Sequence, residues 1–415
     1  MLRAFTIGAA KLARAQRRVL VSAVVFAMSC GTAVAQGRIY RDGSFWVEET
    51  TGTMTAGRSF KAHMDMGSIT YSGGASGNTI TYVVRKRVSA GSEEQARRVF
   101  EAYRITARSG DVDVLSGDVE GDWRRGSVHV AVTGPRQQQL VKVSTDGGDV
   151  GVMHIEGRAE VNTDGGNVNV DDIVGTADIE TGGGNAHVGL VKGDLQLRSG
   201  GGNVDVDNIG RNAALETGGG NIGVNRVNGD LAVTTGGGSI TVKQVGGHLK
   251  ATTGGGALEL GNVGGAVTAE TGGGSIRLSS GAIVTAETGA GSIQCMNVRR
   301  GIRAETGTGA IVAEFTAKRG EFTDSRLEAG MGDIIVYLPA DLAVTVRAAI
   351  DLANGHSIQS EFNALKVTQS EGFGPQEVYA EGALNGGGPT LKLHTTNGNI
   401  SLRRLKKIVS SDDQR

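Results

Sequence analysis

The chain has 415 residues, with 42 basic and 43 acidic side chains and only two cysteines. Its 68 glycines occur without a collagen triplet, and its 39% apolar content is too high for a disordered chain. Composition therefore excludes collagen and disorder and favours a glycine-punctuated repeat protein. The charge balance also argues against nucleic acid as the main partner.

Residues 1–35 have the features of a secretory signal peptide. A basic segment without acids, from Arg3 to Arg18, precedes an apolar run from Val19 to Met28 and the small residues Ala33-Val34-Ala35. The run is too short to span a bilayer comfortably. We predict cleavage after Ala35, export to the periplasm, cell surface or medium, and no stable membrane insertion. A twin-arginine signal and lipidation of Cys30 are the alternatives.

Residues 36–144 are predicted to form an irregular β region that caps the repeats. Ser92, followed by two acids and an apolar stripe through Phe100, predicts one short helix within it. The aromatic residues of the chain gather in this region. We expect them to cap the open end of the fold and to offer one possible contact surface: Phe45, Trp46, Tyr71, Tyr82, Phe100, Tyr103 and Trp123.

Residues 145–315 are predicted to form a regular array with a constant period of eighteen. Each repeat contains a cluster similar to Thr-Gly-Gly-Gly, and we call its last glycine the anchor glycine. A fixed period of this kind indicates stacked units that bury their apolar side chains only against one another. The interval between anchors is eighteen up to Gly274 and then becomes seventeen, eighteen and twenty-three: Gly148, Gly166, Gly184, Gly202, Gly220, Gly238, Gly256, Gly274, Gly291, Gly309 and Gly332.

Apolar residues occupy fixed places after each anchor glycine. They lie two, four, seven, eleven and thirteen residues after it, as do Ile222, Val224, Val227, Leu231 and Val233. Alternation within each pair is typical of a strand with one buried face. We therefore predict an all-β fold, a single-chain parallel β-solenoid (β-helix) with two strands in each 18-residue rung. Right-handed coiling is favoured, although a left-handed coil of three hexapeptides would have the same period.

Polar residues recur at the corners of the predicted rungs. Thr or Ser precedes every glycine cluster, and its parity places the hydroxyl inside, where it can bond to the turn. Asn167, Asn185, Asn203 and Asn221 predict a second ladder just after the anchors. Because the anchor glycine is the constant member of each cluster, we expect it to need a positive φ.

The repeats offer no recognisable chemistry. No helix follows the glycine clusters, which excludes a phosphate loop, and the histidines show no metal spacing. Cys295 occupies a buried valine column and is predicted to be a core residue. We predict no catalytic residue, no cofactor and no metal site. If calcium did bind, the first candidates would be Asp146, Asp149, Asp164 and Asp171.

Acidic residues recur in the outward column just before the threonines. Such a column can be a solvated face or a surface for a cationic partner, and it carries one arginine, Arg198. We favour solvation as its main role and expect any partner to contact this face or the aromatic region. The acids of the column are Glu180, Glu216, Glu270, Glu287, Glu305 and Glu328.

Residues 316–405 are predicted to form further rungs and a C-terminal cap, and residues 406–415 a polar tail. The segments Gly332–Ala340, Gly386–Leu393 and Thr395–Leu402 follow the helix and the glycine rungs in an order that resembles the bacterial putative-adhesin family of exported β-solenoid proteins. The resemblance covers residues 60–405 and brings no catalytic residues with it.

Together these features predict an exported, non-enzymatic, adhesin-like binding or scaffolding protein of the cell envelope. Its partner would be an envelope or surface protein or a polysaccharide. The alternative is a carbohydrate-active enzyme of the polysaccharide lyase or hydrolase β-helix type, with a site in the C-terminal region. That region offers Glu328, Asp341, Asp351 and Glu361. The constant period leaves no room for cleft-forming loops in the array, and no aromatic residue lies between Trp123 and Phe315.

Overall fold

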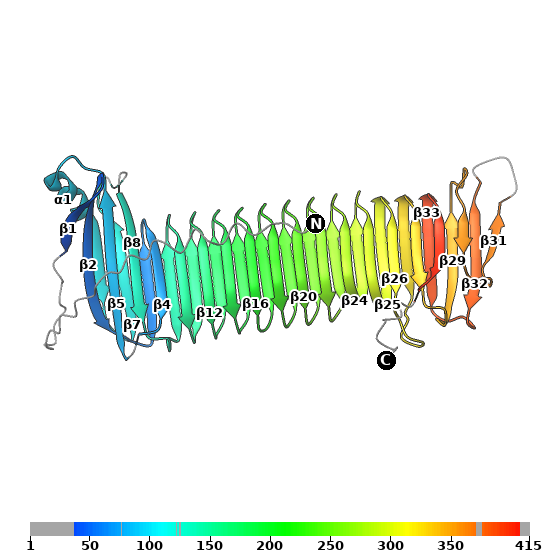
Figure 1. Ribbon diagram of the computed structural model, residues 1–415, viewed down its shortest axis with the longest axis horizontal. Helices are drawn as coiled ribbons and strands as arrows, with labels where there is room; N and C mark the ends of the chain where they lie inside the picture. Colours follow the sequence, from blue (N-terminus) through cyan, green and yellow to red (C-terminus); the bar gives the residue numbers. More distant parts are fainter. Residues whose placement is uncertain (1–36, 76, 122, 124–125, 371–375, 407–415) are drawn as a thin grey trace, which may run out of the picture. The chain divides into compact units, whose positions relative to one another are not determined.

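The computed structural model describes residues 37–75, 77–121, 123, 126–370 and 376–406. These residues form 34 strands and one helix, and all the strands belong to one hydrogen-bonded sheet (Figure 1). The predicted signal peptide, with Cys30, and residues 407–415 of the predicted tail lie outside the described residues.

The elements fall into three groups along the chain. The N-terminal group is β1 (Arg38–Asp42), β2 (Phe45–Thr55), β3 (Ser59–Met64), β4 (Ser68–Gly73), β5 (Thr79–Val88), α1 (Glu93–Glu101), β6 (Tyr103–Arg108), β7 (Val112–Val119) and β8 (Gly126–Gly134). The array begins with β9 (Leu140–Thr145), β10 (Val150–Ile155), β11 (Arg158–Thr163), β12 (Val168–Ile173), β13 (Ala177–Thr181), β14 (Ala186–Val191), β15 (Leu195–Ser199), β16 (Val204–Ile209), β17 (Ala213–Thr217), β18 (Ile222–Val227), β19 (Leu231–Thr235) and β20 (Ile240–Val245). It continues with β21 (Leu249–Thr253), β22 (Leu258–Val263), β23 (Val267–Thr271), β24 (Ile276–Thr288), β25 (Ile293–Thr308), β26 (Ile311–Phe315), β27 (Ser325–Met331) and β28 (Ile334–Leu338). The C-terminal group is β29 (Val344–Ile350), β30 (Ile358–Ser360), β31 (Lys366–Gln369), β32 (Val378–Leu384), β33 (Thr390–Asn397) and β34 (Ile400–Arg404).

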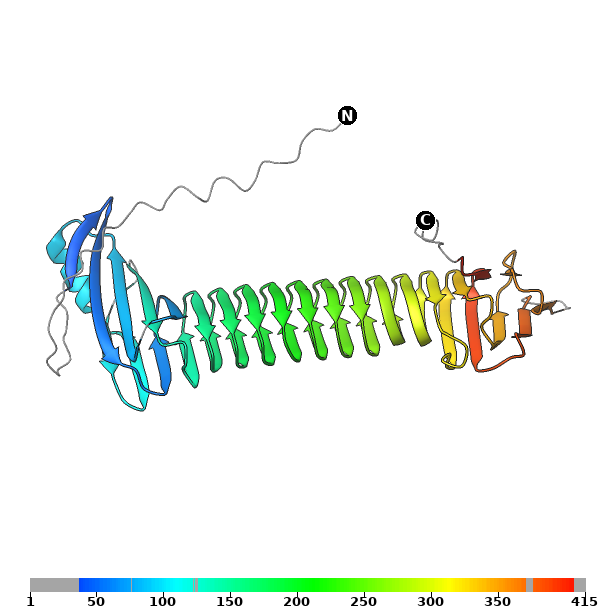
Figure 2. The same ribbon diagram turned by 60° about the horizontal axis from the view of Figure 1, so that its bottom comes forward.

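Each rung of the array consists of a first strand and a second strand, and every strand pairs in parallel with the equivalent strand of the next rung. Val204 of β16 lies opposite Ile222 of β18, and Leu215 of β17 lies opposite Val233 of β19. The five predicted apolar columns are buried; in one rung Ile222, Val224 and Val227 are at most 2% exposed. The predicted parallel β-solenoid with 18-residue rungs is therefore confirmed, and the rungs follow one another in chain order (Figure 2).

The anchor glycines are required by close stacking and not by a positive φ, so that expectation was wrong for most of them. Positive φ occurs at the anchors Gly309 and Gly332 but not at those from Gly148 to Gly291. A Cβ on Gly202 would lie 2.0 Å from the carbonyl oxygen of Gly184 in the preceding rung. The middle glycine of the same cluster, Gly201, has no heavy atom within 4 Å of its would-be Cβ. The constant glycine therefore marks the point where two rungs touch backbone to backbone.

Both predicted corner ladders are present. Thr181 Oγ1 donates to the Gly166 carbonyl of the preceding rung at 2.9 Å and accepts from the Gly184 N–H of its own rung at 3.1 Å. At the next corner the Asn185 N–H donates to Asn167 Oδ1 at 3.0 Å. Each of these side chains thus forms a hydrogen bond with a backbone N–H or C=O group at a corner, which the tight turn could not pair by itself.

At both ends of the array, spatial order departs from chain order. The rung β3/β4 lies between β7/β8 and β9/β10, and β33/β34 lies between β27/β28 and β29/β30. Antiparallel strands then cover the outermost rungs. Strands β5, β2 and β1 continue from β8, β6 pairs with β7, and β32 and β31 continue from β29. Such strands occupy edges on which another chain could otherwise pair.

The predicted helix is confirmed as α1, with Ser92 as its N-cap. The Ser92 side chain accepts from the Gln95 N–H at 3.3 Å, and Glu93 and Glu94 stand in the first turn. Its buried residues, Ala96 and Phe100, pack on the N-terminal strands.

Candidate functional site

The second strands of the array present a continuous outward surface, which we call the second-strand face. Its side chains lie ten, twelve and fourteen residues after each anchor glycine, between the buried ones. In the rung of β15 they are Asp194, Gln196 and Arg198, while Leu195 and Leu197 are buried. Because second strands pair in register, equivalent side chains form columns that run across the strands.

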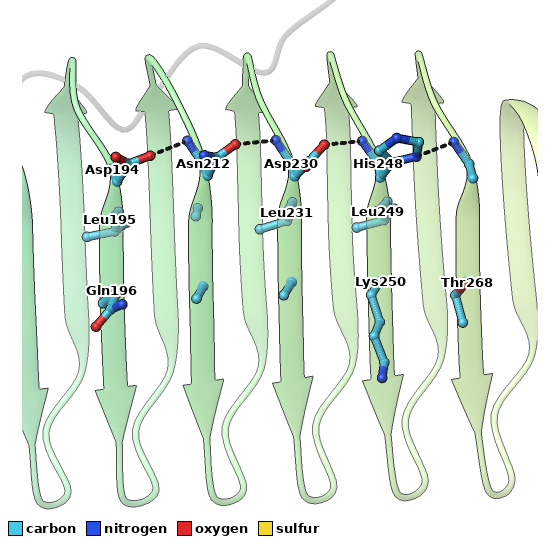
Figure 3. A pocket seen from close by; sticks show the side chains of 14 residues that line it. Asp194, Leu195, Gln196, Asn212, Asp230, Leu231, His248, Leu249, Lys250 and Thr268 are labelled. Atoms are coloured by element: carbon cyan, nitrogen blue, oxygen red, sulfur yellow. Dashed lines mark hydrogen bonds between the residues drawn. The ribbon is translucent and has the colours of Figure 1, made fainter.

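A groove of about 760 Å³ crosses this face from β15 to β23 (Figure 3). The groove exists because two of the outward side chains that lie twelve residues after an anchor glycine are alanines, which are shorter than their neighbours. Ala214 and Ala232 lie in register between the longer side chains of Gln196 and Lys250. The groove therefore has a small apolar floor and polar ends, and it spans several rungs without a break in the sheet.

One wall of the groove is a hydrogen-bonded ladder at position ten, drawn with dashed lines in Figure 3. The Asn212 N–H donates to Asp194 Oδ1 at 3.0 Å, and the Asp230 N–H donates to Asn212 Oδ1 at 2.9 Å. The ladder continues from the His248 N–H to Asp230 Oδ1 and ends where the Ala266 N–H donates to His248 Nδ1 at 3.0 Å. Since that nitrogen accepts, the proton of a neutral His248 is on Nε2. The wall is thus fixed by the backbone of successive rungs.

The predicted glutamate column lies on the same face, and three arginines (Arg198, Arg303 and Arg326) offset half of its six negative charges. Five of its six members contact an arginine, and among the described residues only Glu270 has no such partner. Exposed ion pairs of this kind contribute little to stability, but they weaken the negative field of the column. The pairs are Glu180–Arg198 at 3.3 Å, Glu216–Arg198 at 4.0 Å, Glu287–Arg303 at 3.6 Å, Glu305–Arg303 at 3.5 Å, and Glu328–Arg326.

Four of the seven aromatic residues of the N-terminal region do not belong to the contact surface that we expected, whereas Phe45, Trp46 and Tyr82 are half-buried. Tyr71, Phe100 and Tyr103 are at most 1% exposed, and Trp123 is 2% exposed. They pack inside the N-terminal rungs; the ring centroids of Tyr103 and Trp123 lie 5.2 Å apart. Burial is also the main cause that raises the pKa of Tyr103. These residues are core, because the antiparallel strands of the N-terminal group lie outside them.

The four acids of the enzymatic alternative are mostly engaged with other groups. Glu328 pairs with Arg326, and both carboxylate oxygens of Asp351 lie 3.0 Å from His394 Nε2. Glu361 accepts from the Arg404 N–H at 2.8 Å, and Asp341 is exposed in the turn after β28. Only Glu328 and Asp351 share a neighbour, since Glu328 is the register partner of His394.

The four calcium candidates are not gathered around one point. Asp149 Oδ1 accepts from the Asn167 N–H at 2.8 Å, and Asp171 Oδ1 accepts from the Leu190 N–H at 2.8 Å, so both stabilise corners. Asp146 and Asp164 lie at another corner, in neighbouring rungs. Asp146 approaches a histidine, His63, that the spacing analysis had set aside.

Cys295 is a core residue, as predicted. It lies on β25 opposite Leu278, is fully buried, and its burial raises the pKa of the thiol to about 12. A thiol with so little thiolate at neutral pH is a poor nucleophile.

The groove is the feature of this face that sequence reasoning missed. Its signal was available, because the outward column that contains Gln196, Ala214, Ala232 and Lys250 can be aligned from the 18-residue period. Ala214 and Ala232 gave no signal by themselves, because they belong neither to a buried column nor to a charged one.

No helix among the described residues is long and apolar enough to cross a membrane. In sequence, residues 47–224, from within β2 to within β18, match the Toastrack DUF4097 family, which confirms the predicted family resemblance over that part of the chain. No curated protein matches the chain.

Two solved structures are similar to the chain. One is a putative cell adhesion protein from Clostridium sporogenes, with 9% identity and a TM-score of 0.18, covering 86% of this chain and 100% of its own. The other is a putative adhesin from Bacteroides fragilis, with 16% identity and a TM-score of 0.24, covering 64% of this chain and 96% of its own. Because both TM-scores are low, the fold assignment depends on the strand ladders of the chain itself.

Proposed function

We propose that this chain, which carries a Toastrack DUF4097 domain over residues 47–224, is an exported, non-enzymatic binding protein of the cell envelope. The groove between Gln196 and Lys250 is the observation that supports this proposal. An adhesin-like role is in keeping with the names of the two similar structures, but it is the groove that supports it for this chain.

The chemistry of the groove favours a protein partner over a glycan. Its floor is the methyl groups of Ala214 and Ala232, and its rim offers carboxylate, amide and ammonium groups such as Asp230 and Lys250. An extended peptide segment could bury apolar atoms on the floor and pair its polar groups with the rim. No aromatic side chain lies between Trp123 and Phe315 to stack on a sugar ring.

Filling the groove tests this role. Ala232→Arg places a long side chain on the exposed floor, and Thr241→Arg adds the same side chain to an exposed position on the first strands. The mature protein, immobilised and exposed to envelope extract, should retain one protein species that the Thr241→Arg variant also retains and the Ala232→Arg variant loses. Equal capture by all three proteins, or capture that a glycosidase removes, would contradict the proposal.

A direct assay separates this role from the carbohydrate-active alternative. Mature protein would be incubated with uronic-acid and neutral polysaccharides, and new reducing ends or unsaturated products would be measured. We expect no turnover. Turnover that Asp351→Asn or Glu328→Gln abolishes would establish the enzymatic alternative instead.

A further inference from the structure

Four aspartates stand one above another at a single corner near the N-terminal end of the array. Asp118, Asp65, Asp146 and Asp164 directly follow register partners in neighbouring strands: Gly117, Met64, Thr145 and Thr163. Backbone bonds continue this register, from the Asp65 N–H to the Gly117 carbonyl at 2.9 Å and from the Asp146 N–H to the Met64 carbonyl at 3.1 Å. The next rungs of the array have glycine at this position, beginning with Gly182.

Stacked like charges oppose the pairing that brings them together. Among the described residues, no lysine or arginine lies within 4.0 Å of the carboxylates of Asp65, Asp146 or Asp164. The negative field extends inward, because Asp65 and Asp118 add to the effect of burial in raising the pKa of Tyr103 beneath them. The corner therefore lacks a compensating positive charge from these residues other than through His63.

His63 contacts a serine on one side and two carboxylates on the other. Its Nδ1 lies 3.0 Å from Ser144 Oγ, which also lies 3.2 Å from the Ala62 carbonyl oxygen. The other ring nitrogen, Nε2, lies 3.5 Å from Asp65 Oδ1 and 4.0 Å from Asp146 Oδ1. An imidazole nitrogen and two carboxylate oxygens therefore face one another at this corner.

The three atoms lie near one another but somewhat farther apart than the ligand atoms of one small ion, so binding would draw these exposed side chains together: His63 Nε2 is 3.5 Å from Asp65 Oδ1 and 4.0 Å from Asp146 Oδ1. They all lie within 4.8 Å of one another. A tetrahedral Zn²⁺ about 2.0–2.2 Å from each ligand atom would separate them by about 3.3–3.6 Å. Asp65 Oδ2 is held by the Val119 N–H at 2.9 Å, which leaves Oδ1 available.

We propose that His63, Asp65 and Asp146 form a binding site for a divalent cation of the zinc class. Imidazole and carboxylate together suit Zn²⁺ and its transition-metal neighbours, whereas Ca²⁺ takes six to eight oxygen ligands. All three side chains are partly exposed, from 36% to 59%, so water can complete the coordination. This proposal replaces the expectation of no metal site, and it does not depend on the proposed binding role.

The site joins two rungs that are distant in the sequence. His63 and Asp65 belong to the rung of β3, and Asp146 follows β9, at the place where spatial order departs from chain order. A bound ion would therefore stabilise this junction by mass action, to an extent set by the concentration of the ion and its affinity.

Calorimetric titration of metal-free mature protein with ZnCl2 tests the site. We expect one equivalent to bind and the Tm to rise with added Zn²⁺. His63→Ala and Asp146→Asn should each weaken binding at least ten-fold and abolish the rise in Tm. Ser144→Ala, which removes the hydroxyl that lies beside His63 Nδ1 and orients the ring, should weaken binding about ten-fold. His129→Ala, at an exposed position on β8, is the matched control and should bind as the wild type does.

Three results would overturn the proposal. They are no saturable binding of Zn²⁺ by the wild type, binding that His63→Ala leaves unchanged, and tighter binding of Ca²⁺ than of Zn²⁺. The exposed positions of His63 and Asp146 make both variants tolerable to the fold, which a Tm measured in EDTA and equal to that of the wild type would verify. Co²⁺ gives a second readout, because tetrahedral coordination produces strong visible absorption that should be absent in the His63→Ala variant.

Discussion

The array and the two ends of the stack continue the same two columns of parallel strands, but the paired strands are separated by different distances in the sequence. Through most of the array, each residue pairs with one 18 positions away, as Val204 does with Ile222. At the ends, the partners are 81 positions apart between β3 and β9, and 66 apart between β27 and β33. A sequence repeat can determine the pairing register of the strands only where its period is constant. The ends instead need antiparallel strands and larger side chains to stop the stack.

A charged side chain introduced into the core of the array should destabilise the array far more than the N-terminal group. Val224 is 2% exposed on β18, and Val224→Asp would place an unpaired carboxylate in a dry interior. We expect a loss of about 4 kcal/mol or more. Hydrogen exchange should show lost protection in β16–β20 and retained protection in β3–β8.

The control for this charge is the next residue along the chain. Asn225 is exposed and its Nδ2 donates to Asp207 Oδ1 at 2.6 Å, so Asn225→Ser should cost less than about 1 kcal/mol. Equal damage from both substitutions would contradict the assignment of buried and outward columns.

Two adjacent glycines of one cluster allow a sharper test of whether the anchor glycine is required by close stacking of the rungs. Gly202→Ala forces a Cβ to within 2.0 Å of the Gly184 carbonyl oxygen, which should cost about 2–3 kcal/mol. Gly201→Ala meets nothing within 4 Å and should be neutral or stabilising by about 0.4–1 kcal/mol. Urea unfolding of both variants would measure the difference. If the two substitutions had the same effect, conformational freedom and not stacking would explain the anchor.

The hydroxyl ladder allows the array to be compared directly with the C-terminal end. Thr181→Val removes an acceptor for the Gly184 N–H and a donor to the Gly166 carbonyl, at a cost of about 1–3 kcal/mol. Thr395 of β33 donates to the Gly332 carbonyl at 2.9 Å, so Thr395→Val removes that one bond. We expect the Thr395 variant to lose less stability in the same urea experiment. A larger loss at Thr395 would show that the ends depend on the ladder more than the array does.

The smallest expected effect is a loss of stability at acid pH, caused by the protonation of Asp172 in the first rungs of the array. The hydrogen bond from His154, at 2.9 Å, is the main cause that lowers the pKa of Asp172, and Arg136 adds to it. A carboxyl whose pKa is lowered in the folded state stabilises the fold above its unfolded value of about 3.9. That stabilisation is lost as the pH falls through the lower folded pKa.

Asp172→Asn isolates this effect, because asparagine also tolerates the left-handed backbone at this position, with φ of 51°. The variant should be slightly less stable than the wild type at pH 5, and the two should converge near pH 2. Thermal unfolding between these pH values would measure the difference. A gap that persists unchanged at pH 2 would indicate that the carboxylate charge is not its origin.

Most of the array could be predicted from the sequence, because every rung repeats the same information. The buried columns, the Thr and Asn ladders and the Ser92 cap all follow from local patterns. The order of rungs at the ends could not be predicted, since no period links residue 59 to residue 140. The expected aromatic contact surface was wrong for its four buried residues for the same reason: the strands that cover residues such as Tyr71 and Tyr103 are placed by distant pairing.

The candidate sites show the same limit. The glutamate column was visible in the sequence, but the ion pairs that Arg303 and Arg326 make with it depend on side-chain conformations that the sequence does not give. His63 and Asp146 are far apart in the chain and become neighbours only because β3 pairs with β9. A short clue was present in His63-x-Asp65, which alternation places on one side of the chain.

One rung is inserted out of chain order at each end of the array, and this restricts how the protein can change in length during evolution. A duplicated repeat added before β3 or after β34 would meet strands that are already paired on both sides. A duplication inside the array needs only one more 18-residue unit, which lengthens the stack by about 4.8 Å and leaves both ends unchanged. Rung number is therefore a dimension that can vary in whole steps between relatives, and a designer could use it to set the distance between two fixed ends.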